Sequence, residues 1–178
     1  MVIETQNNFR GAWPVRVITL GGKTKAELRE RLRQASVELN KYAEELFASG
    51  LFVVSLARYS LNIVETSVAG LGFTQGATMG EIHGRAGSLG LGLCPLELGP
   101  CLRLEYLDQP EVDLAQRARP AQAPAGAATI MSAALVEDDE FPKGFYLRRT
   151  AGVLWLRGYR SGPDHVWSSD DRLVFVRV

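Results

Sequence analysis

An apolar stripe between Thr24 and Phe47 constrains the fold of this chain more than any other feature of its sequence. The members of the stripe follow one another at spacings of four, three, four, three and four residues: Leu28, Leu32, Ala35, Leu39, Tyr42 and Leu46. Such spacings are the repeat of one face of an α-helix. Thr24 and Glu27 add a capping-box pattern at its start, in which the hydroxyl and the carboxylate satisfy free donors of the first turn. The stripe therefore predicts one long helix over residues 24–47.

Short runs of β-forming residues surround this predicted helix. They predict strands over residues 13–20, 59–68, 102–107, 129–136, 144–150, 153–159 and 172–178. Ala151 and Gly152 lie between two of these runs and predict a tight hairpin connection. A second capping box, formed by Thr78 and Glu81, predicts a short helix that ends near residue 89.

The order of these elements predicts an α+β fold. In it, one long and one short helix pack on a mostly antiparallel sheet with a C-terminal β-meander. A chain of 178 residues is long enough for one good-sized domain, so we expect a single domain over residues 1–178. The stretch at about residues 108–128 is rich in Ala, Pro and Gln and lacks aromatic residues, which predicts a flexible loop within that domain.

The composition is that of an ordinary globular protein, with 46% hydrophobic and 22% charged residues. Because 20 Lys and Arg residues balance 20 Asp and Glu residues, the net charge gives no general attraction to nucleic acid or to an anionic membrane. We therefore expect neither as a partner. No apolar run approaches the roughly 18 residues of a spanning helix, and the first residues lack the apolar core of a signal peptide. These features predict a cytoplasmic protein, in which Cys94 and Cys101 are reduced.

The sequence Gly21-Gly22-Lys23-Thr24 stands between a predicted strand and a predicted helix, which is the layout of a phosphate-binding loop. The nucleotide-binding pattern G-x-x-x-x-G-K-[ST] also requires a glycine five residues before Gly22. That position is Val17. We therefore interpret the two glycines as a turn and Thr24 as the cap of the helix.

The residue types that bind zinc are few in this chain: Cys94, Cys101, His83 and His165. The cysteines are seven positions apart and the histidines lie in distant segments, whereas structural zinc sites have close paired spacings. A cysteine nucleophile with a histidine base requires a fold that brings the two together, which the sequence leaves open. We expect no metal and no cofactor.

Two groups of polar residues stand among apolar neighbours and form the predicted binding surface. The first group lies within residues 94–110: Glu97, Arg103, Tyr106 and Gln109. The second group crowds a predicted turn before the last strand: Asp164, His165, Trp167 and Asp171. A loop of this composition can be a binding or acid–base site, and it can equally be an ordinary turn that Trp167 anchors to the core.

Three stretches are similar to a group of small bacterial proteins of unassigned function: Gly76–Ile82, Leu89–Pro110 and Pro163–Val176. The most specific shared patterns are CPxExGPxLRLxYxxQP, which begins at Cys94, and DHxWxxDDRxVF, which begins at Asp164. With the preceding helix, the resemblance covers most of the chain from about Thr24 onward. It implies a coherent single domain and supplies no mechanism.

These patterns predict a cytoplasmic binding or interaction module without intrinsic catalysis. Its partner would be a protein or a small molecule, and a homodimer is compatible with the sequence. The alternative is a small hydrolase or nuclease-like enzyme that uses Glu97, Asp164, His165 or Asp171 beside a basic hairpin. That hairpin would supply Arg148, Arg149, Arg157 and Arg160. The enzyme interpretation requires Glu97, Arg103 and His165 to line one concave pocket.

Overall fold

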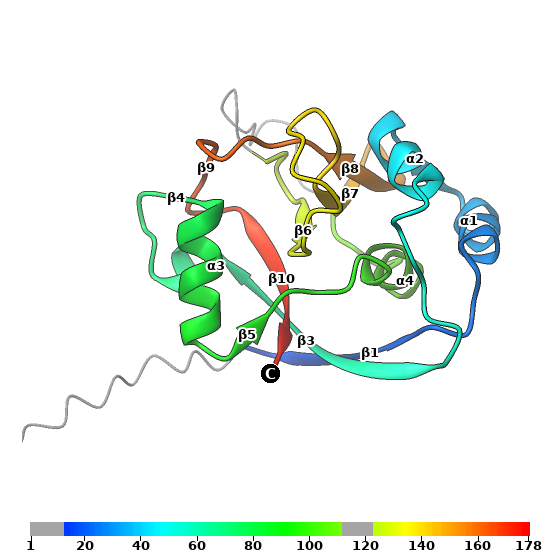
Figure 1. Cartoon of the computed structure of the whole chain (residues 1–178), viewed down its shortest axis with the longest axis horizontal. Coiled ribbons are helices and arrows are strands. Elements are labelled where there is room, and N and C mark those ends of the chain that lie inside the picture. The colour runs from blue at the N-terminus through cyan, green and yellow to red at the C-terminus, as the bar shows by residue number, and fades with distance from the viewer. Residues whose placement is uncertain (1–12, 112–122) are drawn as a thin grey trace, which may run out of the picture.

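The chain folds around one curved mixed sheet, seen in a computed structural model that describes residues 13–111 and 123–178. The strand order is β1-β3-β10-β6-β7-β8-β2, and the two ends of the sheet lie on either side of helix α4 (Figure 1). The strands of this sheet are β1 (Val15–Leu20), β2 (Val37–Leu39), β3 (Tyr59–Ser67), β5 (Leu91–Gly92), β6 (Ala128–Ile130), β7 (Gly144–Thr150), β8 (Val153–Tyr159) and β10 (Arg172–Arg177). Strand β5 pairs with β10 outside the main path.

A second, two-stranded sheet pairs β4 (Ala77–Thr78) with β9 (Val166–Trp167). The helices of the described residues are α1 (Lys25–Gln34), α2 (Lys41–Ala48), α3 (Met79–Ser88) and α4 (Leu98–Glu105), together with the short 3-10 helix η1 (Ala69–Leu71). The prediction of an α+β fold is confirmed. The main sheet is mostly antiparallel, with parallel pairing only between β6 and β10 and between β2 and β8 in the part of the chain described.

The predicted hairpin is confirmed as the connection between β7 and β8. Thr150 pairs with Val153, so Ala151 and Gly152 form a two-residue loop. Both have positive φ angles, of 50° and 75°, which is the backbone of a type I′ turn. Strands β6, β7 and β8 form a meander, whereas β10 returns to the middle of the sheet between β3 and β6.

The prediction of one long helix over residues 24–47 is wrong. Helix α1 ends at Gln34, and Ser36 takes a left-handed backbone with a φ of 54°. Residues Val37–Leu39 then pair with β8, and Asn40 caps the start of α2 by accepting a hydrogen bond of 2.9 Å from the N–H of Ala43. The apolar stripe persists through all three pieces because each of them faces the same core.

The prediction of a strand over residues 102–107 is also wrong, because this segment belongs to helix α4. Every residue from Leu98 to Arg103 is buried and only Glu105 at the end of the helix is exposed, while residues 102–107 alternate apolar and polar side chains as a strand does. Pro100 lies in the first turn, where its missing N–H breaks no hydrogen bond within the helix. The strand expected over residues 129–136 is likewise shorter and covers only β6.

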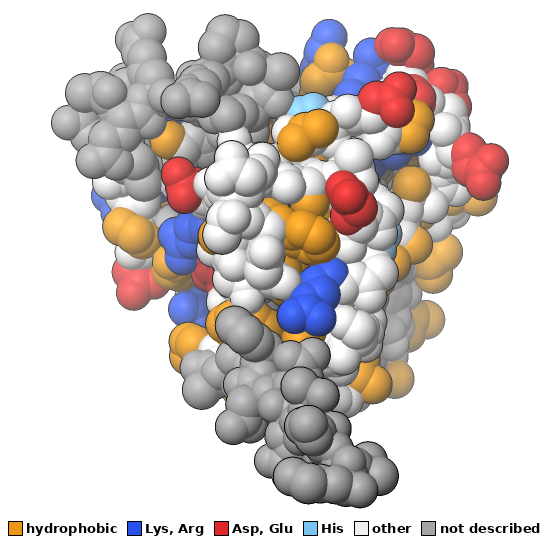
Figure 2. All heavy atoms as spheres, turned by 90° about the vertical axis from the view of Figure 1, so that its left-hand side faces the viewer, with side chains coloured by type: hydrophobic (Ala, Val, Ile, Leu, Met, Phe, Trp, Pro, Cys, Tyr) orange, Lys and Arg blue, Asp and Glu red, His pale blue; other side chains and the backbone are white. Residues whose placement is uncertain are grey.

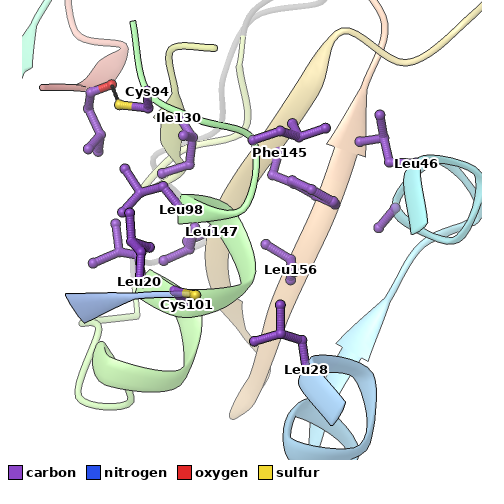
Figure 3. Close-up of a cluster of buried hydrophobic side chains, with 14 of the residues drawn as sticks. Leu20, Leu28, Leu46, Cys94, Leu98, Cys101, Ile130, Phe145, Leu147 and Leu156 are labelled. Atoms are coloured by element: carbon purple, nitrogen blue, oxygen red, sulfur yellow. Dashed lines mark hydrogen bonds between the residues drawn. The ribbon is translucent and has the colours of Figure 1, made fainter. Parts of the chain in front are cut away.

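The main core fills the space between the sheet and helices α1, α2 and α4 (Figure 3). Leu98 and Cys101 of α4 lie among Leu20 of β1 and Leu147 of β7. Gly99 allows α4 to approach β7 closely, since a Cβ atom there would lie only 2.7 Å from Cδ2 of Phe145. Helix α4 is therefore the centre of the fold.

A second core lies on the opposite face of the sheet, beneath α3. It includes Val64, Ile82, Trp167 and Phe175. The short helix predicted from Thr78 and Glu81 is confirmed as α3, with both hydrogen bonds of its capping box present. Charged side chains are scattered and form no large patch on the side of the molecule that carries α3 (Figure 2).

The predicted loop at about residues 108–128 falls mainly on residues 112–122, which lie outside the described residues. At its two ends, Gln109 is fully buried and Ala128 begins β6. No helix within residues 13–111 or 123–178 is long and apolar enough to cross a membrane.

Candidate ligand-binding site

Strands β7 and β8 present an aromatic and basic face on the side of the sheet opposite the main core. Successive side chains of a strand point to opposite faces. Because Phe145, Leu147 and Leu156 are buried in the main core, their neighbours lie on the other face. Those neighbours are Tyr146, Arg148, Trp155, Arg157 and Tyr159.

A hollow of about 340 Å³ lies on this face of the hairpin. Its lining comes from segments that are far apart in the sequence. The sheet contributes Thr129, Tyr146, Arg157 and Tyr159, the loop at β9 contributes His165 and Trp167, and the start of α2 contributes Asn40 and Tyr42. No carboxylate and no cysteine is among the described residues that line it.

Aromatic rings form one connected cluster in this hollow. The ring centroids of Tyr146 and Tyr159 are 6.5 Å apart, and Tyr159 meets Trp167 edge to face at 5.7 Å. His165 lies on the same indole, also edge to face, at 5.3 Å. Trp167 is only 3% exposed, yet its indole N–H has no acceptor among the residues that the structure describes. A buried tryptophan N–H usually finds one, so this donor is unused within the described residues.

Two arginines lie close to the phenol of Tyr146. Tyr146 is opposite Arg157 in the register, and Arg148 is the next residue of β7 on the same face. Burial raises the pKa of Tyr146, while the positive charges of Arg157 and Arg148 oppose this rise. The Cζ atom of Arg157 is 4.9 Å from the ring centroid of Trp155. Among the described residues, neither arginine forms an ion pair.

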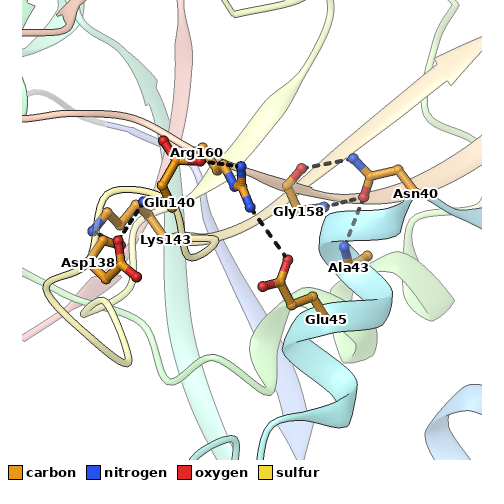
Figure 4. A network of polar contacts seen from close by, with 8 residues as sticks. All are labelled: Asn40, Ala43, Glu45, Asp138, Glu140, Lys143, Gly158 and Arg160. Carbon is orange, nitrogen blue, oxygen red and sulfur yellow. Dashed lines mark hydrogen bonds and ion pairs between the residues drawn. The ribbon is translucent and has the colours of Figure 1, made fainter.

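The third arginine of this region, Arg160, is already occupied. Its guanidinium lies between Glu140 and Glu45, with N–O distances of 2.8 and 3.9 Å (Figure 4). It also lies over the ring of Tyr42, at 4.6 Å from the centroid. Arg160 therefore fixes one wall of the hollow and contributes no free positive charge.

Asn40 fixes the same wall to the sheet. Its side chain donates to the carbonyl of Gly158 at 3.0 Å and accepts from the N–H of Gly158 at 2.8 Å (Figure 4). A side chain at position 158 would collide with the backbone of Tyr42, since its Cβ would lie 2.6 Å from the carbonyl carbon. Helix α2 therefore begins directly against β8, and the hollow has a rigid wall on this side.

The four residues predicted in the turn before the last strand divide into two roles. His165 and Trp167 line the hollow. Asp171 is buried, and its carboxylate accepts a hydrogen bond of 2.8 Å from the N–H of Ser168, which holds the turn. Burial raises the pKa of Asp171, and that hydrogen bond partly opposes the rise. Asp164 is exposed in the loop and is not part of the lining.

Arg103 and Gln109 were expected on a binding surface, but both side chains are 0% exposed. Nη1 of Arg103 donates to Oε1 of Gln109 at 2.5 Å, and Nη2 donates to the carbonyl of Tyr106. Nε2 of Gln109 donates in turn to the carbonyls of Gly126 and Leu147 at 3.0 and 3.3 Å. The prediction failed because the sequence alone does not tell whether a polar side chain among apolar neighbours lies on the surface or is buried with hydrogen-bond partners. These two residues tie α4 to β7.

Glu97 belongs to a third place, between α4 and the start of β3. Its carboxylate accepts hydrogen bonds from the hydroxyl of Tyr59 at 2.6 Å and from the N–H of Ser55 at 3.2 Å. Burial raises the pKa of Tyr59, and the hydrogen bond to Glu97 raises it further. Glu97 therefore has its partners within the fold and does not line the hollow.

The cysteines are buried, free thiols. Burial raises the pKa of Cys94 to about 12 and that of Cys101 to about 11, the latter with help from the charge of Glu97. Neither is a thiolate at neutral pH, which is the form that attacks a substrate or binds a metal. No group of three or more metal-binding side chains occurs in the described parts of the chain.

Gly21 and Gly22 form the turn inferred from the sequence. Their φ angles are 74° and 68°, and a Cβ at Gly21 would lie 2.1 Å from the carbonyl oxygen of Ala57. The N–H of Gly22 donates to the carbonyl of Ser55, so it is not free for a phosphate. Thr24 forms the predicted capping box, with its N–H 2.7 Å from Oε2 of Glu27.

The geometric requirement of the enzyme interpretation is not met, since Glu97, Arg103 and His165 lie in three separate environments. Sequence reasoning singled out Arg157, Arg160, His165 and Trp167, and it missed the tyrosines of the hollow. Successive side chains of a strand point to opposite faces, so the predicted hairpin of residues 144–150 and 153–159 has Tyr146, Arg157 and Tyr159 on one face. This rule could have identified the tyrosines of the hollow. Asn40 and Tyr42 were hidden within the predicted long helix.

In comparisons with known proteins, no family model matches the chain, and neither does any curated protein or solved structure.

Proposed function

We propose that this protein is a binding module without intrinsic catalysis, and that it holds a small planar molecule in the hollow beside β7 and β8. The observation that carries the proposal is the indole N–H of Trp167. Trp167 lines the hollow, and its buried N–H has no acceptor among the described residues, so a ligand that moves the indole slightly on binding can supply one.

The size and lining of the hollow support this proposal. Ligand pockets generally occupy about 300–1,000 Å³ and combine aromatic walls with a few polar groups. The hollow has about 340 Å³ and contains the cluster of Tyr146, Tyr159, His165 and Trp167. A flat ring can pack against such a cluster, because aromatic pairs gain about 0.5–1.5 kcal/mol beyond the area that they bury.

The absence of a carboxylate from the described lining favours binding over hydrolysis. General acid–base catalysis needs a titrating pair in reach of the substrate. His165 is the one imidazole among the described lining residues, and Asp171 is engaged by the N–H of Ser168. The hydrolase alternative therefore has no acid–base pair here.

Saturation-transfer NMR with a panel of small planar molecules, such as indole, purine and benzoate, tests the proposal. We expect a subset to bind the wild-type chain and to lose binding in Trp167→Phe, which keeps a ring and removes the donor. The matched control is Trp13→Phe, because Trp13 does not line the hollow. Equal thermal melting of the two variants shows that both fold. Binding that survives in Trp167→Phe, or no binding by any planar molecule, would contradict the proposal.

The proposal extends to the cellular location of the module and to its partner. A cytoplasmic location is supported by the free thiols of Cys94 and Cys101, since reducing compartments keep cysteines in this form. A protein partner or a second copy of the chain stays a prediction.

A further inference from the structure

Arg157 lines the hollow, and Arg148 follows it on the same face of the hairpin, outside the lining; neither forms an ion pair with a described residue. Arg157 pairs with Tyr146 across the hairpin, and Arg148 pairs with Trp155 one step further along the same face. Arg148 and Arg157 are therefore diagonal neighbours, a separation that long side chains bridge easily. Both positive charges act to lower the pKa of Tyr146, the residue that faces Arg157 across the hairpin.

Neither guanidinium has a carboxylate partner among the described residues, although Arg157 contacts the hydroxyl of Tyr146. Arg160 lies between two glutamates and Arg172 pairs with Glu65, whereas Arg148 and Arg157 form no ion pair with any described residue. The Nε atoms of both, like those of Arg103 and Arg149, are buried and have no acceptor in the described part of the chain. An anion beside these guanidinium groups would gain charge-assisted hydrogen bonds from their terminal N–H groups.

The shape of this cationic site favours a phosphate monoester over a carboxylate. A guanidinium offers several N–H donors in a fixed plane. Two guanidinium groups together match the three terminal oxygens and the charge near −2 of a phosphate monoester. A carboxylate has one charge and two oxygens, which one arginine satisfies. Trp155 lies under Arg157 and holds its plane by a cation–π contact, so the donors are oriented before any ligand arrives.

We infer that the ligand of the hollow is a phosphate monoester of a ring compound, with a nucleoside monophosphate as the simplest representative. This inference rests on the proposed function and names its ligand class. The ring occupies the cluster of Tyr146, Tyr159 and Trp167, and the phosphate lies against Arg157 and Arg148. The glycine turn before Thr24 takes no part.

Isothermal titration of the full chain with AMP, adenosine and ribose 5-phosphate separates the two parts of the ligand. We expect AMP to bind at least about tenfold more tightly than adenosine, because charge-assisted hydrogen bonds contribute roughly 1.5–3 kcal/mol. It should also bind more tightly than ribose 5-phosphate, which lacks the ring. The preference for AMP over adenosine should shrink at high salt.

Arg157→Gln should abolish the preference for AMP over adenosine. Arg148→Gln gives the same test with a residue farther from the hollow, in case Arg157→Gln unfolds. Arg31→Gln is the matched control, because Arg31 is exposed on α1 and far from the hairpin in sequence. It should retain the preference in full.

The outcomes distinguish the inference from the proposed function. Equal affinity for AMP and adenosine, or a preference that persists in both Arg157→Gln and Arg148→Gln, would overturn the phosphate inference and leave the ring-binding hollow standing. Failure of every nucleotide, nucleoside and planar molecule to bind would overturn both.

Discussion

Arg103 is the largest fully buried side chain of the protein, and its positive charge has no carboxylate partner among the described residues. Burial lowers the pKa of Arg103 to about 10, so it remains charged at neutral pH. The oxygens that compensate this charge are Oε1 of Gln109 and the carbonyl of Tyr106. The charge thus depends on one glutamine side chain, which in turn binds the carbonyls of Gly126 and Leu147.

Replacing Gln109 by leucine should therefore destabilise the protein strongly. Gln109→Leu leaves the buried guanidinium without its side-chain acceptor, and we expect a loss of about 3 kcal/mol in the free energy of unfolding. The double variant Arg103→Met with Gln109→Leu should recover a large part of this loss, because it removes the buried charge as well.

Urea denaturation of the two single variants and the double variant measures this coupling. Gln75→Leu is the control, since Gln75 is exposed and should change stability by less than about 0.5 kcal/mol. Strictly additive effects in the double variant would contradict the coupling.

At the scale of elements, the segment from Thr24 to Ala48 shows what a stripe of apolar residues can and cannot determine. The spacing fixed which residues face the core: Leu28, Leu32 and Leu46 are buried. The spacing could not locate the break in the helix. The same apolar stripe continues past the left-handed residue Ser36 and through the three-residue strand β2, because this strand faces the same core as the two helices. The local signals of the break were Asn40, a good helix cap, and the β-branched Val37 after a serine.

The left-handed backbone at Ser36 should make glycine the preferred residue there. A non-glycine residue in this region costs about 1–2 kcal/mol, partly offset by the greater freedom of glycine in the unfolded chain. We expect Ser36→Gly to raise the free energy of unfolding by roughly 0.5–1 kcal/mol in thermal melts. Ser36→Ala, which keeps the strain, should not stabilise the protein. If Ser36→Gly were destabilising, helix α1 would have to continue past Ser36 in solution.

The two capping boxes should make the starts of α1 and α3 sensitive to acid. The hydrogen bonds from Thr24 lower the pKa of Glu27, and those from Thr78 lower the pKa of Glu81. A lowered folded-state pKa means that the ionised carboxylate adds stability above the ordinary pKa of 4.5, and that this stability is lost as the pH falls through the folded-state value. The stability difference between wild type and Glu27→Gln should therefore shrink on acidification.

Thr24→Ala tests the same cap at neutral pH and should cost about 1 kcal/mol of stability. Lys23→Ala is its adjacent control and should leave folding intact. A loss of nucleotide binding on changing Lys23 would instead revive the phosphate-loop interpretation of residues 21–24.

Local chemistry was thus predictable and long-range burial was not. The caps at Thr24 and Thr78 and the turn at Ala151 and Gly152 depend only on neighbours in the sequence, and all were found. Helix α4 was missed because residues 102–107 alternate apolar and polar side chains, which is the pattern of a strand, and because its burial at the centre of the fold is a tertiary effect. Only the tertiary structure determines that Arg103 lies inside and Arg157 on the wall of a hollow.

At the scale of the whole molecule, the curved sheet explains why the candidate site has parts from distant segments. The sheet curves around α4 (Figure 1). The face of β7 and β8 that carries Tyr146 and Arg157 meets the start of α2 and the loop at β9. The arginines of the hairpin and His165 with Trp167 were visible in the sequence as separate groups. Their meeting with Tyr42, Tyr146 and Tyr159 depends on strand order, which no spacing in the sequence encodes.

The chain contains three tryptophans, so its indole N–H groups give three separate signals in a proton–nitrogen NMR spectrum. Titration with AMP tests the central claim through the signal of Trp167, assigned by its loss in Trp167→Phe. The account predicts that this signal shifts in a saturable way, because its buried N–H gains an acceptor, while the signal of Trp13 stays in place. A Trp167 signal that does not move, or that moves no more than that of Trp13, would contradict the claim that the hollow binds this ligand.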